Sequence, residues 1–252
     1  MRQDQRAPFV EALQRARVSA YAPGEFVGQE SFMRASEILD LGRRAGLAPG
    51  VRALDLCCGV AGPGRYLTRE LGCDYLGVDY SASALEIARS LSRDLPCRFE
   101  EMRIPPLPLG SFEVVLLLET ILAFEDKAGL LAEVAGVLQP GGRFAFTLEE
   151  GVALSAGERE TMPDADTVWL TPLAEIEELL SIAGMRLVWS EDCSRSHLGV
   201  VEALLAAFSG DGEIALQIGE QALAELLAAH RLWRDWLASG RIRKFMLLAE
   251  KR

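Results

Sequence analysis

Apolar residues along this chain recur with two spacings, one typical of strands and one typical of helices. Amphipathic stretches at 64–71, 81–93, 127–138 and 172–184 have the helical spacing. Short apolar runs predict buried strands at 51–57, 74–80, 112–119, 143–150, 185–192 and 243–251. Because strands and helices alternate from about residue 46 to 192, the pattern indicates βαβ units and an α/β fold with a largely parallel sheet.

Within this pattern, the run FEVVLLLE at 112–119 is the most apolar and predicts the central strand. Ser83 and Glu86 have the spacing of a capping box near the start of the helix at 81–93. The turn Gln139–Gly142, which contains a proline and two glycines, ends the helix at 127–138.

Two helical regions flank this core. Residues 1–45 have helical periodicity with a break at Pro23–Gly24, and a long stretch rich in alanine and leucine precedes the last strand. We therefore divide the chain into an N-terminal helical cap (1–45), a core (46–193), a helical lid that contributes to the substrate site (194–240) and the final strand of the core sheet (241–252).

Composition narrows the function classes. The chain has 252 residues and a formal net charge of −11, which argues against a basic nucleic-acid-binding face and against binding to an anionic membrane. Its first residues are polar, without the apolar core of a secretion signal, and no run approaches the length of a membrane span. The five cysteines form no C-x-x-C motif, so we expect reduced thiols, a cytoplasmic protein and no metal site.

Candidate chemistry gathers after the first predicted core strand, in the stretch RALDLCCGVAGPGRYL at 52–67. Gly59, Gly62 and Gly64 would let a ligand approach the backbone closely. Asp79, at the end of the next strand, suits the two hydroxyls of a ribose. Since ligands of parallel sheets bind beyond the carboxyl ends of the strands, we predict a nucleoside derivative there.

The charges at this edge favour one kind of nucleoside. Asp55 precedes the glycine loop, and Asp79, Glu101 and Glu119 end later segments, while no basic residue occurs in the loop before Arg65. A pyrophosphate would face several carboxylates, and the glycine order differs from the G-x-G-x-x-G dinucleotide motif. S-adenosylmethionine carries a sulfonium and an ammonium group and no phosphate, so its charges match.

The stretch Leu54–Leu67 resembles motif I of the class I S-adenosylmethionine-dependent methyltransferases. It is most similar to their small-molecule branch, the sarcosine/dimethylglycine- and tocopherol-like enzymes of methyltransferase type 11, with the pattern LDxGCGxGGPxRxLA. Cys57 and Ala61 each stand where that pattern has glycine. The resemblance extends over residues 27–190 and implies a Rossmann-like, doubly wound sheet of seven strands whose last strand is antiparallel.

The resemblance also implies roles for individual residues. Asp79 would bind the ribose with Tyr80 beside the adenine, Glu101 and the backbone N–H of Met102 would meet the adenine, and Glu119 would face the methionine portion or the substrate. The cofactor-binding set is Arg34, Asp55, Cys57, Gly59, Gly62, Asp79, Tyr80, Glu101, Met102 and Glu119. Arg34 would pair with the cofactor carboxylate or remain a surface charge.

A general base is needed only where the methyl acceptor holds its proton tightly. The chain has two histidines. His197 follows the strand at 185–192 and Glu149 ends the strand at 143–150, so both are candidate bases. His230 shares a helical stripe with leucines and Trp233, which favours a packing role. The basic cluster Arg241–Lys244 is interpreted as a flank of the final strand.

The function expected from these features is methyl transfer from S-adenosylmethionine to a small molecule, with S-adenosylhomocysteine as product. Two alternatives stay open: a methyltransferase acting on protein or RNA, and a non-catalytic cofactor-binding protein on the same fold. The acidic composition argues against the first alternative, and the intact acids at 55, 79, 101 and 119 argue against the second. The sequence does not indicate an oligomeric state.

Overall fold

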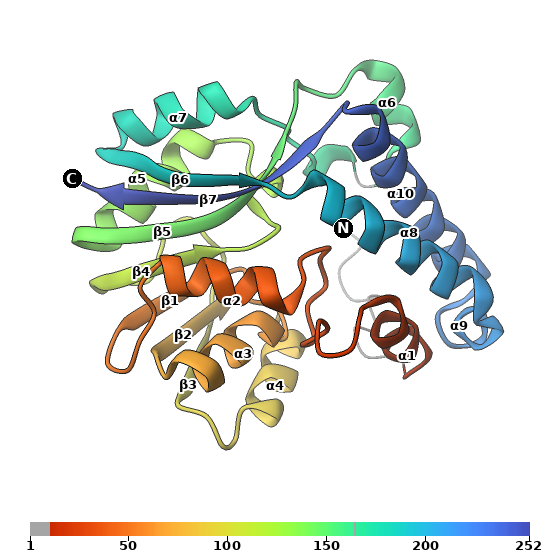
Figure 1. Cartoon of the computed structure of the whole chain (residues 1–252), viewed down its shortest axis with the longest axis horizontal. Helices are drawn as coiled ribbons and strands as arrows, with labels where there is room; N and C mark the ends of the chain where they lie inside the picture. The colour runs from red at the N-terminus through yellow and green to blue at the C-terminus, as the bar shows by residue number, and fades with distance from the viewer. Residues whose placement is uncertain (1–10, 164) are drawn as a thin grey trace.

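Seven strands form one sheet at the centre of the molecule (Figure 1). The computed structural model describes residues 11–163 and 165–252, so the first ten residues of the predicted N-terminal cap lie outside the described part. The strands are β1 (Arg52–Leu56), β2 (Asp74–Asp79), β3 (Cys97–Glu101), β4 (Phe112–Leu117), β5 (Leu138–Glu150), β6 (Met185–Asp192) and β7 (Arg243–Lys251). Their order is β3-β2-β1-β4-β5-β7-β6, which places β4 in the middle, as its apolar sequence predicted.

The direction of the strands confirms the predicted α/β fold class. The neighbouring strands from β3 to β5 pair in parallel, whereas β7 lies between β5 and β6 and runs antiparallel to both. From β1 the chain adds β2 and β3 on one side of the sheet, and it then continues with β4 on the other side of β1. The carboxyl ends of β1 and β4 therefore flank the crevice where ligands of such sheets bind.

Strand β3 has no counterpart among the six strands predicted from apolar runs. It is an edge strand, and most of its residues are exposed or half-buried. Because one of its edges and much of its surface face water, its sequence CRFEE carries charges instead of a continuous apolar run.

Helices cover both faces of the sheet. They are α2 (Ala35–Arg44), α3 (Gly62–Leu71), α4 (Ala82–Leu91), α5 (Lys127–Val137) and α7 (Leu173–Ile182). Buried residues of α2, α3 and α4 pack in one apolar cluster, and those of α5 and α7 pack in another on the opposite face.

One detail of the predicted helix at 81–93 is wrong. The N-cap of α4 is Ser81, whose hydroxyl accepts a hydrogen bond from the backbone N–H of Ala84 at 3.3 Å. Ser83 already lies inside the helix, and its hydroxyl lies 3.1 Å from that of Ser81. The helix therefore starts two residues earlier than the capping-box pattern indicated.

A second group of helices lies beyond the carboxyl ends of the parallel strands (Figure 1). It contains α1 (Glu11–Ala20), α8 (Ser194–Gly210), α9 (Gly212–Ile218) and α10 (Glu220–Ser239), with the short α6 (Ala156–Thr161), η1 (Ile121–Ala123) and η2 (Ala165–Thr167). Helices α8 to α10 lie between β6 and β7 in the chain, and α1 packs against α8. A helical segment thus occupies the predicted lid region, while its action as a lid stays a prediction.

None of the helices in the described ranges 11–163 and 165–252 combines the length and apolarity needed to cross a membrane.

Substitution of Gly64 should test the packing between α3 and the sheet. A Cβ atom at Gly64 would lie 2.2 Å from the ring of Tyr75, which is fully buried. We expect Gly64→Ala to lower the free energy of unfolding by roughly 1–3 kcal/mol, the usual range for an overpacked core. Gly199→Ala is the matched control, because a Cβ there meets nothing within 4 Å on an exposed face of α8. The control variant should raise the free energy of unfolding by up to about 1 kcal/mol. Equal changes in the free energy of unfolding for the two variants, measured by urea unfolding, would contradict this packing.

Candidate active site

The loop between β1 and α3 has an unusual backbone. Cys57, Gly59 and Ala61 all have positive φ angles, at 57°, 53° and 55°. These angles lie in the left-handed region that glycine adopts most easily, and a side chain there costs roughly 1–2 kcal/mol. The two departures from motif I therefore keep the conformation that glycine would favour, and they do so at a cost in strain.

The glycines of this loop have different surroundings. A Cβ atom at Gly59 would meet nothing within 4 Å, so the backbone there is open to a ligand. A Cβ atom at Gly62 would lie 2.3 Å from the carbonyl oxygen of Gly28. The space beside Gly62, where a ligand was predicted to approach the backbone, is therefore filled by the N-terminal segment of the chain. Gly59 is the better candidate for contact with a ligand.

Asp79 holds the loop from the end of β2. Its side chain accepts hydrogen bonds from the backbone N–H groups of Gly59, at 2.8 Å, and Ser81, at 2.9 Å. A carboxylate has about four acceptor positions, so both bonds leave room for hydroxyl donors. The predicted ribose contact of Asp79 fits this position and stays a prediction.

Asp55 lies in β1 and is only 4% exposed. One of its oxygens accepts a hydrogen bond from the hydroxyl of Tyr75 at 2.6 Å. Burial raises the pKa of Asp55 to about 7, although the Tyr75 hydrogen bond acts in the opposite direction. A cationic ligand near this carboxyl would favour its charged form, which agrees with the charge expected of the cofactor.

The raised pKa of Asp55 predicts a measurable pH dependence of stability. A buried acid whose pKa lies above its ordinary value near 4 stabilises the fold fully at low pH, and this contribution disappears as the pH rises through about 7. An amide at this position does not titrate. The free energy of unfolding of Asp55→Asn, relative to that of the wild type, should therefore increase as the pH rises from 5 to 8. Urea unfolding at both pH values checks this, and an identical difference between the proteins at pH 5 and pH 8 would rule it out.

The residues expected around the adenine are only partly available. Tyr80 is 60% exposed, with the guanidinium of Arg103 at 5.2 Å from its ring centre. Glu101 is exposed at the end of β3. The backbone N–H of Met102 already donates to the carbonyl of Asp79 at 2.9 Å. The predicted bond from this N–H to the adenine would compete with the bond to Asp79, and the roles of Met102, Tyr80 and Glu101 stay predictions.

Arg34 and His197 both lie beside the carboxylate of Glu37. The Arg34 guanidinium pairs with Glu37 at 2.9 Å, and His197 lies fully buried with its Nε2 atom 3.4 Å from the same carboxylate. Burial alone would raise the pKa of Glu37, but hydrogen bonds from His197 and Arg34 lower it to about 2. These contacts join α2 to α8.

The predicted role of His197 as a base at the substrate site is not supported, because His197 does not line the cavity described next. Its ring has no surface in contact with solvent. The predicted pairing of Arg34 with the cofactor would compete with its bond to Glu37.

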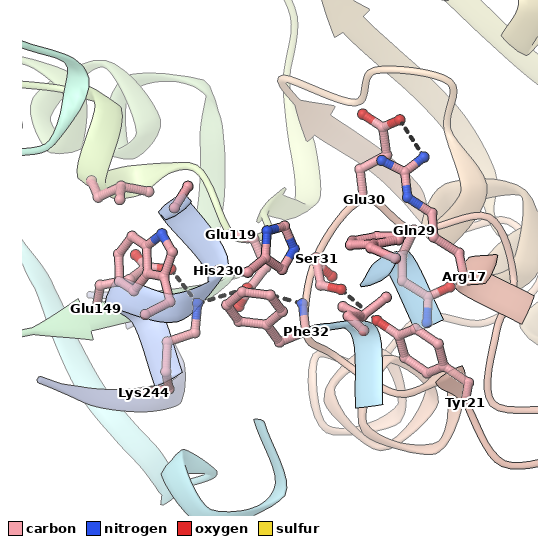
Figure 2. Close-up of a pocket in the computed structure, with 15 residues that line it drawn as sticks. Arg17, Tyr21, Gln29, Glu30, Ser31, Phe32, Glu119, Glu149, His230 and Lys244 are labelled. Atoms are coloured by element: carbon pink, nitrogen blue, oxygen red, sulfur yellow. Dashed lines mark hydrogen bonds and ion pairs between the residues drawn. The ribbon is translucent and has the colours of Figure 1, made fainter. Parts of the chain in front are cut away.

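A cavity of about 230 Å³ lies at the carboxyl edge of the sheet (Figure 2). Its walls come from six parts of the chain: the N-terminal segment, the ends of β4 and β5, the start of β7, and helices α8 and α10. The described residues that line it are Arg17, Tyr21, Gln29, Glu30, Ser31, Phe32, Glu119, Leu122, Glu149, Leu204, Phe208, Ala229, His230, Trp233 and Lys244. The predicted lid region and N-terminal cap thus both contribute walls.

Lys244 lies between two carboxylates at one side of this cavity. Its Nζ atom is 2.6 Å from Oε2 of Glu119 and 2.5 Å from Oε1 of Glu149, and the Lys244 side chain is 3% exposed. Glu149 and Lys244 are direct cross-strand partners on β5 and β7. The predicted base Glu149 therefore lines the cavity, but one of its oxygens is bound to a cation.

Glu119 is fixed in an uncommon conformation just after β4. Its φ angle is 58°, and its backbone N–H donates to the hydroxyl of Thr147 at 2.5 Å. Burial acts to raise the pKa of Glu119, but the charge of Lys244 outweighs it, so the pKa is lowered. Strained backbone of this kind clusters at functional sites, in agreement with a site role for Glu119.

His230 packs against apolar side chains, as its helical stripe predicted, and it also faces the cavity. His230 lines the cavity, with its ring packed edge-on against Phe32 and Phe208. Its Nδ1 atom lies 2.8 Å from the carbonyl oxygen of Leu226. Because a carbonyl only accepts, Nδ1 carries the hydrogen and Nε2 holds the free lone pair of the neutral ring. Burial lowers the pKa of His230, which favours this neutral form.

Comparison with known proteins assigns this arrangement to a family. Residues 54–146 match the family model described as "Methyltransferase domain". This chain carries a class I methyltransferase domain. The matched segment runs from β1 into β5 and contains the glycine loop, Asp55, Asp79 and Glu119. Such domains use S-adenosylmethionine as the methyl donor, which confirms the cofactor expected from the charges.

A curated relative supports the assignment to the methyltransferases. The glycine/sarcosine/dimethylglycine N-methyltransferase of Actinopolyspora halophila is 28% identical over 81% of this chain. The match spans 38% of that relative's own length, so this chain corresponds to only part of that protein.

Two solved structures show the same fold. The cyclopropane synthase MmaA2 from Mycobacterium tuberculosis has a TM-score of 0.82, with 13% identity over 97% of this chain and 95% of that chain. Phosphoethanolamine N-methyltransferase 2 of Haemonchus contortus, solved in complex with S-adenosyl-L-methionine, has a TM-score of 0.79, with 20% identity over 98% of this chain and 58% of that chain.

Lys244 is a residue of the cavity wall that sequence analysis missed. The interpretation of the cluster at 241–244 as a strand flank overlooked one signal. Lys244 alternates with the apolar residues Met246 and Leu248 on one side of β7, and both of these are buried. A lysine in register with buried residues indicates a buried charge, which requires a partner.

Proposed function

We propose that this protein transfers a methyl group from S-adenosylmethionine to a small molecule bound in the cavity. The observation that carries the proposal is the position of the cavity. Its wall includes Glu119, which follows β4, and β4 is the neighbour of the strand that leads into the methyltransferase glycine loop. Cofactor loop and cavity therefore lie at the same edge of the sheet.

The residues present fit the expected cofactor. The backbone at Gly59 is open, Asp79 retains acceptor capacity, and Asp55 is a buried acid that a cation would help to ionise. S-adenosylmethionine supplies a methyl group that its sulfonium charge has already activated. The protein's contribution is then to hold donor and acceptor in line and to exclude water.

The dimensions of the cavity support a small acceptor. Its 230 Å³ lies below the range of about 300–1,000 Å³ typical of sites for drug-sized ligands. Its enclosure by α8, α10 and the N-terminal segment argues against a folded protein or an RNA duplex as substrate. The net charge of −11 also argues against nucleic acid as a partner.

The five cysteines support a reducing compartment, such as the cytoplasm, as the site of action. All five are free thiols in the structure. Burial raises the pKa of Cys57 and Cys58, so these two residues are poor thiolates and better suited to packing than to redox chemistry.

A methyl-transfer screen tests the proposed function. The purified protein is incubated with S-adenosylmethionine carrying a labelled methyl group and with pools of small amines, alcohols, thiols and carboxylic acids. We expect label to appear in one class of acceptor, together with S-adenosylhomocysteine. Tight binding of the cofactor without transfer to any class would instead favour the non-catalytic alternative.

A further inference from the structure

The charges of the described residues that line the cavity do not balance. Arg17 and Glu30 pair with each other at 3.1 Å, so Lys244 is the only cation among the described lining residues that contacts Glu119 and Glu149. Outside the lining, His197 lies close enough to Glu119, and Lys127 close enough to Glu149, to interact with them electrostatically. The lining residues that the structure describes thus carry one negative charge in excess. A buried carboxylate without a cation of its own is unfavourable, so this lining favours a bound cation.

The two carboxylates also have free acceptor atoms. Oε1 of Glu119 and Oε2 of Glu149 are buried and have no hydrogen-bond partner among the described residues. No other lining residue in the described part of the chain has a buried side-chain polar atom in this state. Both atoms can only accept while the carboxylates are charged, so a ligand that satisfies them must donate hydrogen bonds.

Aromatic rings complete the surroundings of a cation. The Nζ atom of Lys244 lies 5.6 Å from the ring centre of Phe32 and 6.0 Å from that of Trp233. Figure 2 shows Lys244, Glu149 and Phe32 side by side, with dashed lines from Lys244 to both carboxylates. This wall already holds one ammonium group, and its chemistry suits a second.

A proton acceptor also lines the cavity. Nε2 of His230 carries a lone pair, because Nδ1 donates to Leu226, and no partner for Nε2 occurs among the described residues. The neighbouring Phe32 and Phe208 rings restrict the imidazole to this orientation.

We propose that the acceptor is an organic amine. It enters as its ammonium ion, the free oxygens of Glu119 and Glu149 bind it, and Nε2 of His230 takes the proton that the nitrogen must lose before it reacts. This inference rests on the proposed methyl transfer and adds the chemical class of its substrate.

The proposed step is balanced. The ammonium N–H bond breaks and its proton moves to Nε2 of His230, which leaves a lone pair on the nitrogen. That lone pair forms a bond to the methyl carbon while the carbon–sulfur bond of S-adenosylmethionine breaks. The products are the methylated ammonium ion and S-adenosylhomocysteine, and His230 returns its proton to solvent.

The test compares probes that match in size but differ in charge. Benzylamine, phenethylamine and cyclohexylamine are titrated into the protein saturated with S-adenosylhomocysteine, beside benzyl alcohol, phenethyl alcohol and cyclohexanol. We expect at least one amine to bind roughly 10- to 100-fold more tightly than its alcohol at pH 7.5, the range for a hydrogen bond to a charged group. Labelled methyl transfer to the same amines is measured in parallel.

Glu149→Gln removes the excess charge without a change in side-chain shape, and Lys244 keeps Glu119 as its partner. We expect this variant to lose most of the preference for amine over alcohol and to bind S-adenosylhomocysteine as before. The matched control is Glu150→Gln, whose carboxylate pairs with Arg243 instead. That control should keep the preference.

His230→Gln tests the proton transfer. We expect it to lower the methylation rate of the bound amine by roughly 100-fold or more, with little change in amine binding. An unchanged rate would overturn the role of His230.

The remaining outcomes separate the two proposals. If S-adenosylhomocysteine does not bind the wild type, the proposed function itself fails. If it binds but no amine binds or is methylated in preference to its alcohol, the amine proposal is overturned and the proposed function stands. If Glu149→Gln weakens the binding of S-adenosylmethionine but not the binding of the amine, the excess charge binds the cofactor and not the substrate. This result would also overturn the proposal.

Discussion

Asp79→Ala should weaken the binding of S-adenosylhomocysteine by roughly 5- to 150-fold, which corresponds to about 1–3 kcal/mol. The Asp79 carboxylate holds two backbone N–H groups, those of Gly59 and Ser81, and it is the predicted partner of the ribose hydroxyls. Its removal leaves donors of both protein and ligand without an acceptor. Isothermal titration calorimetry measures the change directly.

A control separates this effect from general damage to the fold. Glu100→Ala removes an exposed carboxylate from β3, the neighbour of β2, and should leave the affinity unchanged. Asp79→Asn keeps an acceptor for one backbone N–H and should lose less affinity than alanine. Unchanged affinity in a folded Asp79→Ala protein would contradict the ribose assignment.

Lys244→Met should lower the free energy of unfolding by about 3–5 kcal/mol, the usual cost of leaving buried charges without their partner. Lys244 is the cation for both Glu119 and Glu149, and the Glu149 side chain is 2% exposed. Burial acts to lower the pKa of Lys244, but both carboxylates outweigh it and raise the pKa, so the native state holds the charged form.

The loss should depend on pH with a defined sign. Without Lys244, burial raises the pKa of Glu119 with no lysine beside it to oppose the effect, so the folded variant binds a proton more readily than the unfolded chain. Its stability should therefore increase as the pH falls from 8 to 5, and the deficit relative to the wild type should shrink. The triple variant Lys244→Met, Glu119→Gln, Glu149→Gln is the control, because it carries no buried charge here and should recover much of the loss at pH 8. A deficit independent of pH in the single variant would contradict the charge triad.

The fold was largely predictable because its strands are buried. The apolar runs that became β1, β2, β4 and β5 are continuous, since parallel strands are covered on both faces. Strand β3 could not be found in this way because it lies at an edge. The glycine loop was also predictable, since left-handed backbone and close contacts restrict the sequence locally, as at Gly62 and Gly64.

The cavity was less predictable because its residues come together only in three dimensions. Helical periodicity placed His230 on an apolar stripe, but that stripe faces the cavity as well as the neighbouring helix. His197 follows a core strand directly, yet its ring lies against Glu37 and does not line the cavity. Glu149 was found from its place at the end of β5, whereas its pairing with Lys244 depends on the insertion of β7 beside β5.

The most direct test of the central claim is parallel calorimetric titration of the purified protein with S-adenosylmethionine, S-adenosylhomocysteine and NADH. The acidic loop, the open backbone at Gly59 and the methyltransferase domain at residues 54–146 predict micromolar binding of the two adenosyl ligands and no binding of NADH. Binding of NADH without the adenosyl ligands would contradict the account of the site, and its assignment to methyl transfer would have to be abandoned.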